Sequence, residues 1–136
     1  MPKYLIDASV LHGWANTRDT HHDICKNFFI EHEGEHLYFS IHSLFEVHAA
    51  RSCRTRGRSF TALPGKHKLR DQIFIDIDRK FYDECQRFKL FDEFAGLRGM
   101  DLIYACCAKI GRFTLVTCDQ DFDQYADKIS VLRLTD

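Results

Sequence analysis

The segment FTLVT, residues 113–117, decides the fold class, because it is the clearest buried strand in the chain. The polar sequence CDQD, residues 118–121, follows it directly. A second apolar run, Tyr4–Ile6, ends in the same way at Asp7. If these two strands are neighbours in a parallel sheet, Asp7 and Asp119 converge at its carboxyl edge, which is where such sheets bind ligands.

Strands and helices alternate along the rest of the chain, without internal repeats. Further strands are expected at residues 37–41, 73–77 (a sheet edge with one wetter face) and 129–132. Helices are expected at 8–15, after a Thr20 cap, from about 43 to 56, at 79–88 and at 99–110, where Gly111 ends the last one; residues 57–65 are a loop. This alternation predicts one domain over residues 1–136 with a three-layer α/β/α fold and a mainly parallel central sheet.

Composition excludes several classes of protein. The chain has 136 residues, of which 45% are hydrophobic and only 2 are proline, which is typical of one folded domain. No apolar run approaches the roughly 18 residues that a membrane span requires, and the amino-terminal segment lacks the long apolar stretch of a secretory signal. The 6 cysteines include no CxxC pair, so we expect reduced, mostly buried thiols in a cytoplasmic protein.

Basic residues are concentrated in one tract. Residues 51–70 hold 7 of the 19 Lys and Arg residues and no acid, so the remaining chain has 12 basic against 20 acidic residues, a formal charge of −8. Such a tract on an acidic protein favours a polyanionic partner, and a solvated helix end that continues into a loop is the alternative. The candidate RNA-binding residues are Arg51, Arg54, Arg56 and Arg58.

Four acidic residues lie next to apolar elements at the expected carboxyl edge. Asp7 and Asp119 follow strands, Asp101 begins a helix, and Glu46 lies in the first turns of another. Two carboxylates about 4 Å apart repel by roughly 4 kcal/mol at an effective dielectric near 20, so protons or cations must offset the charge. Oxygen ligands favour Mg²⁺ or Mn²⁺; helix caps and solvated loop acids are the alternative interpretation.

Four motifs give the sequence its family resemblance. They are LIDASVL (Leu5–Leu11), SLFEVHAA (Ser43–Ala50), GMDLIYACCA (Gly99–Ala108) and LVTCDQDF (Leu115–Phe122). In this order, and over essentially the whole chain, they resemble the PIN-domain nucleases, especially the VapC-like ribonuclease toxins of toxin–antitoxin systems.

The resemblance implies a role for each matching residue. Asp7, Glu46, Asp101 and Asp119 would be catalytic and would bind one or two Mg²⁺ or Mn²⁺ ions, with Asp121 as a further metal ligand. Ser9 and Thr117 would orient these ligands through hydrogen bonds without binding the metal themselves. Cys118 departs from the family pattern, in which an Asn is common before the last Asp.

The implied activity is metal-dependent hydrolysis of RNA phosphodiester bonds, with RNA, a cognate antitoxin and a second copy of the chain as partners. A non-catalytic nucleic-acid-binding or assembly module with the same fold is the alternative.

A phosphatase of the haloacid dehalogenase type is disfavoured, because Ser9 stands where a second Asp is needed. His42, four residues before Glu46, is either a contact near the metal site or a surface or capping residue.

Overall fold

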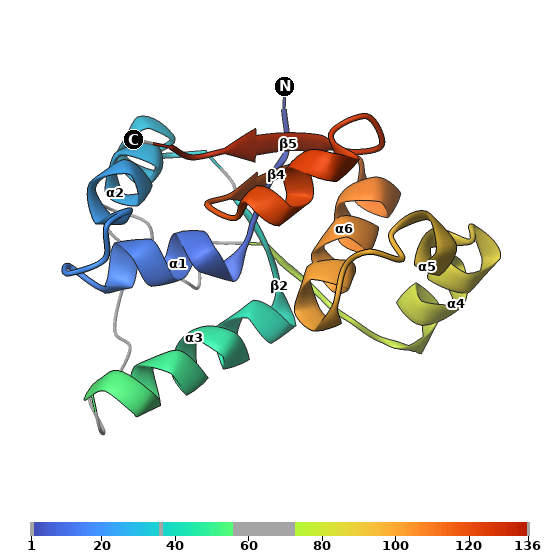
Figure 1. Ribbon diagram of the computed structural model, residues 1–136, viewed down its shortest axis with the longest axis horizontal. Helices are drawn as coiled ribbons and strands as arrows, with labels where there is room; N and C mark the ends of the chain where they lie inside the picture. The colour runs from blue at the N-terminus through green and yellow to red at the C-terminus, as the bar shows by residue number, and fades with distance from the viewer. Residues whose placement is uncertain (1, 36, 56–72, 136) are drawn as a thin grey trace.

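A five-stranded parallel sheet forms the centre of the molecule (Figure 1). The computed structural model describes residues 2–35, 37–55 and 73–135. The strands are β1 (Tyr4–Ile6), β2 (Tyr38–Ser40), β3 (Ile73–Ile75), β4 (Thr114–Thr117) and β5 (Ser130–Arg133), and their order is β3-β2-β1-β4-β5. The predicted α/β fold is therefore confirmed, and the sheet is entirely parallel.

Helices cover both faces of the sheet (Figure 1). They are α1 (Ala8–Ala15), α2 (His22–Glu31), α3 (Ile41–Thr55), α4 (Arg79–Arg87), α5 (Leu90–Glu93), α6 (Gly99–Gly111) and the 3₁₀ helix η2 (Gln120–Tyr125). Helices α1, α2 and α3 lie over one face, and α4, α5 and α6 lie over the other. None of the helices in the described ranges is long and apolar enough to cross a membrane.

The central strands bury alternate side chains in two separate cores. Leu5 and Leu115, which pair across β1 and β4, pack with α6, whereas Ile6 and Val116 pack with α1 and α2. This period of two buries both faces of β1 and β4, as expected for strands at the centre of a parallel sheet. β1 pairs with β4, so the two strands that precede Asp7 and Asp119 are neighbours.

Two glycines are required by close packing. A Cβ on Gly13 would lie 2.6 Å from the Sγ of Cys25, so glycine lets α1 and α2 approach closely. A Cβ on Gly111 would overlap the ring of Phe113. The residue with left-handed backbone at the end of α6 is the next one, Arg112, with φ of 56°. Gly111 is therefore needed for space, and the prediction that it ends the helix was wrong by one residue.

The start of α2 also differs from the prediction. α2 begins at His22 without a side-chain cap, and Thr20 lies in the preceding turn. The Oδ1 of Asp19 accepts a hydrogen bond of 2.8 Å from the backbone N–H of His21 in that turn. An Asp side chain that bonds the backbone two residues on forms a turn, and this local bond competes with a threonine cap.

Candidate active site

Asp7 is a buried carboxylate at the carboxyl end of β1. It is only 4% exposed, and its Oδ2 accepts hydrogen bonds from the hydroxyls of Thr117 (2.6 Å) and Ser9 (2.8 Å). Burial raises the pKa of Asp7, the two hydroxyl bonds oppose that shift, and the charge of Asp119 adds to it. A negative charge at Asp7 is therefore costly and only partly compensated by neutral donors.

The same two hydroxyls hold the loop after β4. The Oγ1 of Thr117 accepts from the backbone N–H of Asp119 (3.0 Å), and the Oγ of Ser9 accepts from the backbone N–H of Cys118 (3.0 Å). The side chain of Cys118 turns towards α2, where its Sγ lies 3.4 Å from the Sγ of Cys25. At Cys118 the hydrogen bond to Ser9 comes from the backbone N–H and does not use the side chain.

Asp101, Asp119 and Asp121 form the tightest group of acids. One carboxylate oxygen from each lies within 4.8 Å of the others. Asp101 stands in the first turn of α6, and Asp119 caps η2 by accepting a 2.9 Å hydrogen bond from the backbone N–H of Asp121. Partial burial, followed by the charges of Asp7, Asp119 and Asp121, raises the pKa of Asp101 to about 6.

Glu46 brings α3 into contact with these acids. Its Oε1 accepts a hydrogen bond of 3.3 Å from the hydroxyl of Tyr104, and partial burial followed by the charges of Asp7 and Asp101 raises its pKa to about 7. The Nε2 of His42 lies 3.6 Å from the same oxygen. Burial lowers the pKa of His42 to about 4, so the imidazole is neutral at pH 7 and this contact is not an ion pair.

The structure therefore links all five predicted acids electrostatically through Asp7 and Asp101, and we call Asp7, Glu46, Asp101, Asp119 and Asp121 the acidic cluster. Asp7 and Asp119 follow strands β1 and β4 at the carboxyl edge of the sheet, and Asp101 lies in the first turn of α6. Among the described residues, Asp101, Asp119 and Asp121 are the only group of three or more possible metal ligands with donor atoms within 4.8 Å of one another. Converging carboxylate oxygens, together with the raised pKa of Asp101, fit a hard divalent cation, which relieves the repulsion between the carboxylates.

Sequence reasoning missed Tyr104, whose hydroxyl joins Glu46 to the start of α1. Its side chain is fully buried, and the only signal is its place three residues after Asp101 on one helix face. The predicted RNA-binding arginines cannot be placed in the same way. Arg51 and Arg54 belong to α3, but their side chains lie outside the described part, as do Arg56 and Arg58 entirely.

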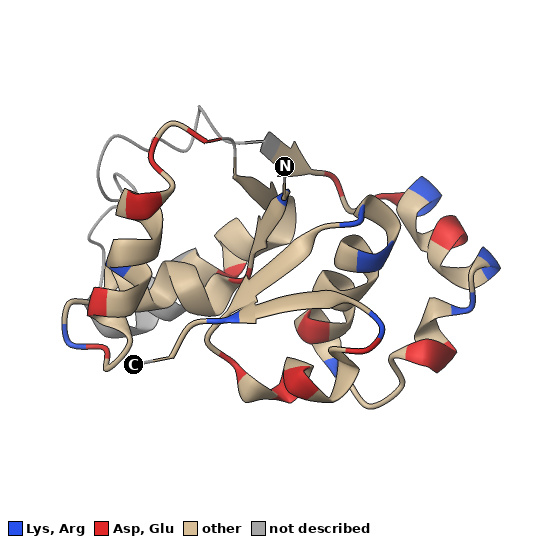
Figure 2. Ribbon diagram, turned by 90° about the horizontal axis from the view of Figure 1, so that it is seen from above, with Lys and Arg blue, Asp and Glu red and all other residues tan. Residues whose placement is uncertain are grey.

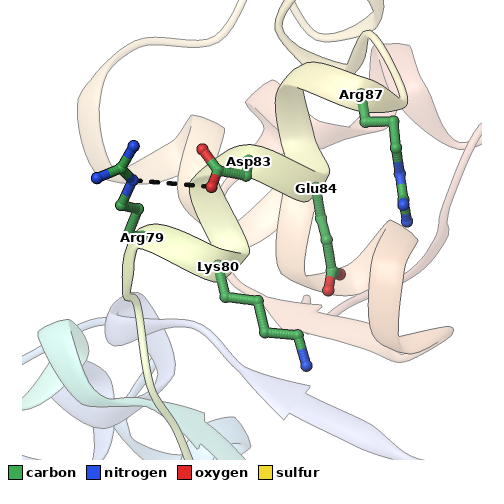
Figure 3. A pocket seen from close by; sticks show the side chains of 5 residues that line it. All are labelled: Arg79, Lys80, Asp83, Glu84 and Arg87. Atoms are coloured by element: carbon green, nitrogen blue, oxygen red, sulfur yellow. Dashed lines mark ion pairs between the residues drawn. The ribbon is translucent and has the colours of Figure 1, made fainter.

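A surface pocket on α4 does not belong to the acidic cluster. Its volume is about 540 Å³, and Figure 3 shows its lining of Arg79, Lys80, Asp83, Glu84 and Arg87. Arg79 and Asp83 form an exposed ion pair with an N–O distance of 3.8 Å. Acidic and basic residues both occur along α4 (Figure 2), so the pocket presents no single charge to a polyanion.

We predict that Thr117→Val lowers the rate of a metal-dependent reaction at the acidic cluster by about tenfold. Residues that form hydrogen bonds to metal ligands and orient them typically contribute 10–100-fold. Valine keeps the buried shape of Thr117 but removes the donor to Asp7 and the acceptor for the N–H of Asp119. Steady-state kinetics checks this expectation. Thr114→Val is the matched control, since Thr114 lies on the same strand and its hydroxyl forms a hydrogen bond with the exposed Ser130 instead of a residue of the acidic cluster. An equal loss in both variants would contradict the role of Thr117.

Comparison with known proteins gives a family match and several structural matches. The PIN domain family model matches residues 4–128. No curated protein matches the chain in sequence. The chain is similar in structure to Mycobacterium tuberculosis VapC20, a Sarcin-Ricin loop cleaving toxin, with a TM-score of 0.67 at 13% identity; the match covers 96% of this chain and 99% of that one.

Two further structures come from toxin–antitoxin systems. A toxin–antitoxin complex from Klebsiella pneumoniae matches with a TM-score of 0.66 at 18% identity, covering 98% of this chain and 99% of that one. VapBC2 from Rickettsia felis, bound to a DNA fragment from its promoter, matches with a TM-score of 0.64 at 16% identity, covering 97% and 98%. At these identities the likeness establishes the fold.

Proposed function

This chain belongs to the PIN domain family, and on that premise we propose that it is a metal-dependent endoribonuclease that acts as the toxin of a toxin–antitoxin pair. The observation that carries the proposal is the convergence of carboxylate oxygens from Asp101, Asp119 and Asp121 within 4.8 Å. Asp7 and Glu46 interact electrostatically with Asp101 from neighbouring elements. Such a concentration of negative charge is unfavourable unless protons or a cation offset it, and above the raised pKa values of Asp101 and Glu46 a cation is needed.

We assign the metal-binding role to the acidic cluster and favour Mg²⁺ or Mn²⁺, since all of its donors are carboxylate oxygens. When bound, such an ion lowers the pKa of water and neutralises charge that develops on phosphoryl oxygens. Asp101, Asp119 and Asp121 would hold it, and Glu46 would either ligate it or orient the attacking water. Ser9 and Thr117 keep the Asp7 carboxylate in one orientation.

RNA is the proposed substrate. M. tuberculosis VapC20 cleaves the sarcin-ricin loop, and by that likeness an exposed RNA loop, with its bases accessible, is the substrate form to test. Arg51, Arg54, Arg56 and Arg58 are the proposed phosphate contacts, because a sequence tract rich in basic residues can bind the RNA backbone.

The proposed partners follow from the toxin assignment. Two of the similar structures contain toxin–antitoxin pairs, which supports an antitoxin partner for this chain. We further propose that the protein forms a homodimer and works in the cytoplasm, where its RNA substrate and reduced thiols would be found.

We expect the purified protein to cleave RNA in Mg²⁺ or Mn²⁺ and to lose that activity in EDTA. Asp119→Asn should lower kcat/KM by about fiftyfold, because it removes one of the three carboxylate charges that would hold the ion, while Asp101 and Asp121 remain. A gel assay with labelled looped and unstructured RNAs measures both effects.

Asp92→Asn is the control for this test, since Asp92 is an exposed acid on α5 outside the acidic cluster. Cleavage that persists at full rate in EDTA or in Asp119→Asn would contradict the proposed site. RNA binding without metal-stimulated cleavage would support the non-catalytic nucleic-acid-binding module instead.

A further inference from the structure

Tyr104 is a polar residue at the centre of an otherwise apolar helix face. It is fully buried, and its neighbours Ala105, Cys106 and Cys107 belong to the core beneath α6. An ordinary phenol is protonated at neutral pH, so the hydroxyl of Tyr104 can donate a hydrogen bond.

The hydroxyl of Tyr104 joins two elements that are far apart in the sequence. It accepts a hydrogen bond of 3.1 Å from the backbone N–H of Ala8, the first residue of α1 and the neighbour of Asp7. It donates one of 3.3 Å to the Oε1 of Glu46 on α3. The donor and acceptor roles of this hydroxyl are thus both used at the acidic cluster.

The described part of the chain holds Glu46 through one oxygen, Oε1. Tyr104 and the Nε2 of His42 both approach Oε1, at 3.3 Å and 3.6 Å, and the rings of His42 and Tyr104 pack with centroids 4.8 Å apart. Among the described residues, no hydrogen bond reaches the second oxygen, Oε2. The described residues therefore constrain one oxygen of this carboxylate and make no hydrogen bond to the other.

We propose that Tyr104 is a positioning residue, whose hydroxyl fixes Oε1 of Glu46 and presents Oε2 to the bound cation or its water. This inference rests on the proposed function, because it assumes that Glu46 serves a metal site. Residues that orient metal ligands commonly change metal affinity without touching the ion themselves.

Tyr104→Phe tests the proposal, since it keeps the ring against His42 and removes only the hydroxyl. We expect the affinity for Mn²⁺, measured by electron paramagnetic resonance on the RNA-free protein, to fall by about tenfold. In the Glu46→Gln background the same substitution should cause no further loss, because Tyr104 acts through Glu46.

Tyr125→Phe is the matched control. Tyr125 is also buried, and its hydroxyl accepts a 2.9 Å hydrogen bond from the backbone N–H of Gly96, which is not a member of the acidic cluster. It should lower thermal stability as Tyr104→Phe does, but leave the Mn²⁺ affinity unchanged. This comparison separates a positioning role from a general structural one.

Several outcomes overturn the proposal. An Mn²⁺ affinity of Tyr104→Phe within about twofold of wild type overturns it, as does an equal loss in the Glu46→Gln background.

The failure of this proposal can be told apart from the failure of the nuclease proposal. If the wild type cleaves RNA while Tyr104→Phe binds Mn²⁺ normally, only the positioning role fails. If the wild type cleaves no RNA but the affinity loss is found, the positioning role stands and the nuclease proposal fails. A wild type that binds no Mn²⁺ overturns both.

If Tyr104→Phe does not fold, the native chain labelled with 3-fluorotyrosine replaces it. The fluorine signal of Tyr104 should shift when Mg²⁺ is added, whereas that of Tyr125 should not. A Tyr104 signal that is insensitive to Mg²⁺ in a protein shown to bind the ion overturns the proposal.

Discussion

Replacing Asp7 with asparagine is expected to lower kcat/KM for RNA cleavage by about a thousandfold, because metal-site charges supply several kcal/mol of transition-state stabilisation. The fold should survive. The asparagine would offer its side-chain oxygen to the hydroxyls of Ser9 and Thr117, which now donate to the buried carboxylate. The loss of activity would therefore come from charge alone.

The same substitution should leave the metal-free protein at least as stable as the wild type. The Asp7 carboxylate is buried and repelled by Asp119, and both effects raise its pKa. Removing the charge removes a desolvation cost in the folded state. Urea denaturation in EDTA measures the free energy of unfolding. A variant that is much less stable, or one that retains full activity after purification, would contradict the assignment of Asp7.

Local sequence pattern was sufficient to predict the sheet and the edge at which the acids gather. A buried strand needs only a short apolar run, and the residue that follows it is carried to the carboxyl edge by the parallel topology. Asp7 and Asp119 are therefore placed by the pairing of β1 with β4, and Asp101 and Glu46 by helices that begin at the same edge.

Contacts across long separations in the sequence could not be predicted in this way. The hydroxyl of Tyr104 bonds to residues 58 and 96 positions away, and no local pattern distinguishes such a tyrosine from an ordinary core residue. Asp121 entered only through the resemblance, as a further metal ligand, because its place beside Asp101 depends on the 3₁₀ helix η2. Helices of this kind are short and leave little periodic signal.

Metal ions should reverse the pH dependence of stability. In the folded protein the pKa of Glu46 rises from 4.5 to about 7 and that of Asp101 from 3.8 to about 6. The folded state then holds protons that the unfolded state has lost, so the stabilising contribution of these groups is complete near pH 4 and disappears as the pH rises through 6 to 7. His42 has the opposite effect below pH 6.5, because burial lowers its pKa to about 4 and keeps it neutral.

Comparison of Glu46→Gln with the wild type isolates one carboxyl from these opposing contributions. In EDTA, the variant should gain stability relative to the wild type as the pH rises from 4.5 to 7, since it lacks the charge that Glu46 acquires. Mg²⁺ or Mn²⁺ should favour the wild type above pH 7, because the ion binds the deprotonated carboxylates. At a hundred times Kd, binding adds about 2.7 kcal/mol, or roughly 10 °C in Tm for a chain of this size.

Thermal unfolding at several pH values, with and without the ion, measures both effects, and the two melting curves should exchange their order when the metal is added. Parallel pH profiles for Glu46→Gln and wild type in EDTA would mean that burial and the charges of Asp7 and Asp101 do not raise the pKa of Glu46. An ion that stabilises both proteins equally would mean that Glu46 does not serve the metal site. The exchange of order follows from one physical condition, namely that protons and a divalent cation compete for the same crowded carboxylates.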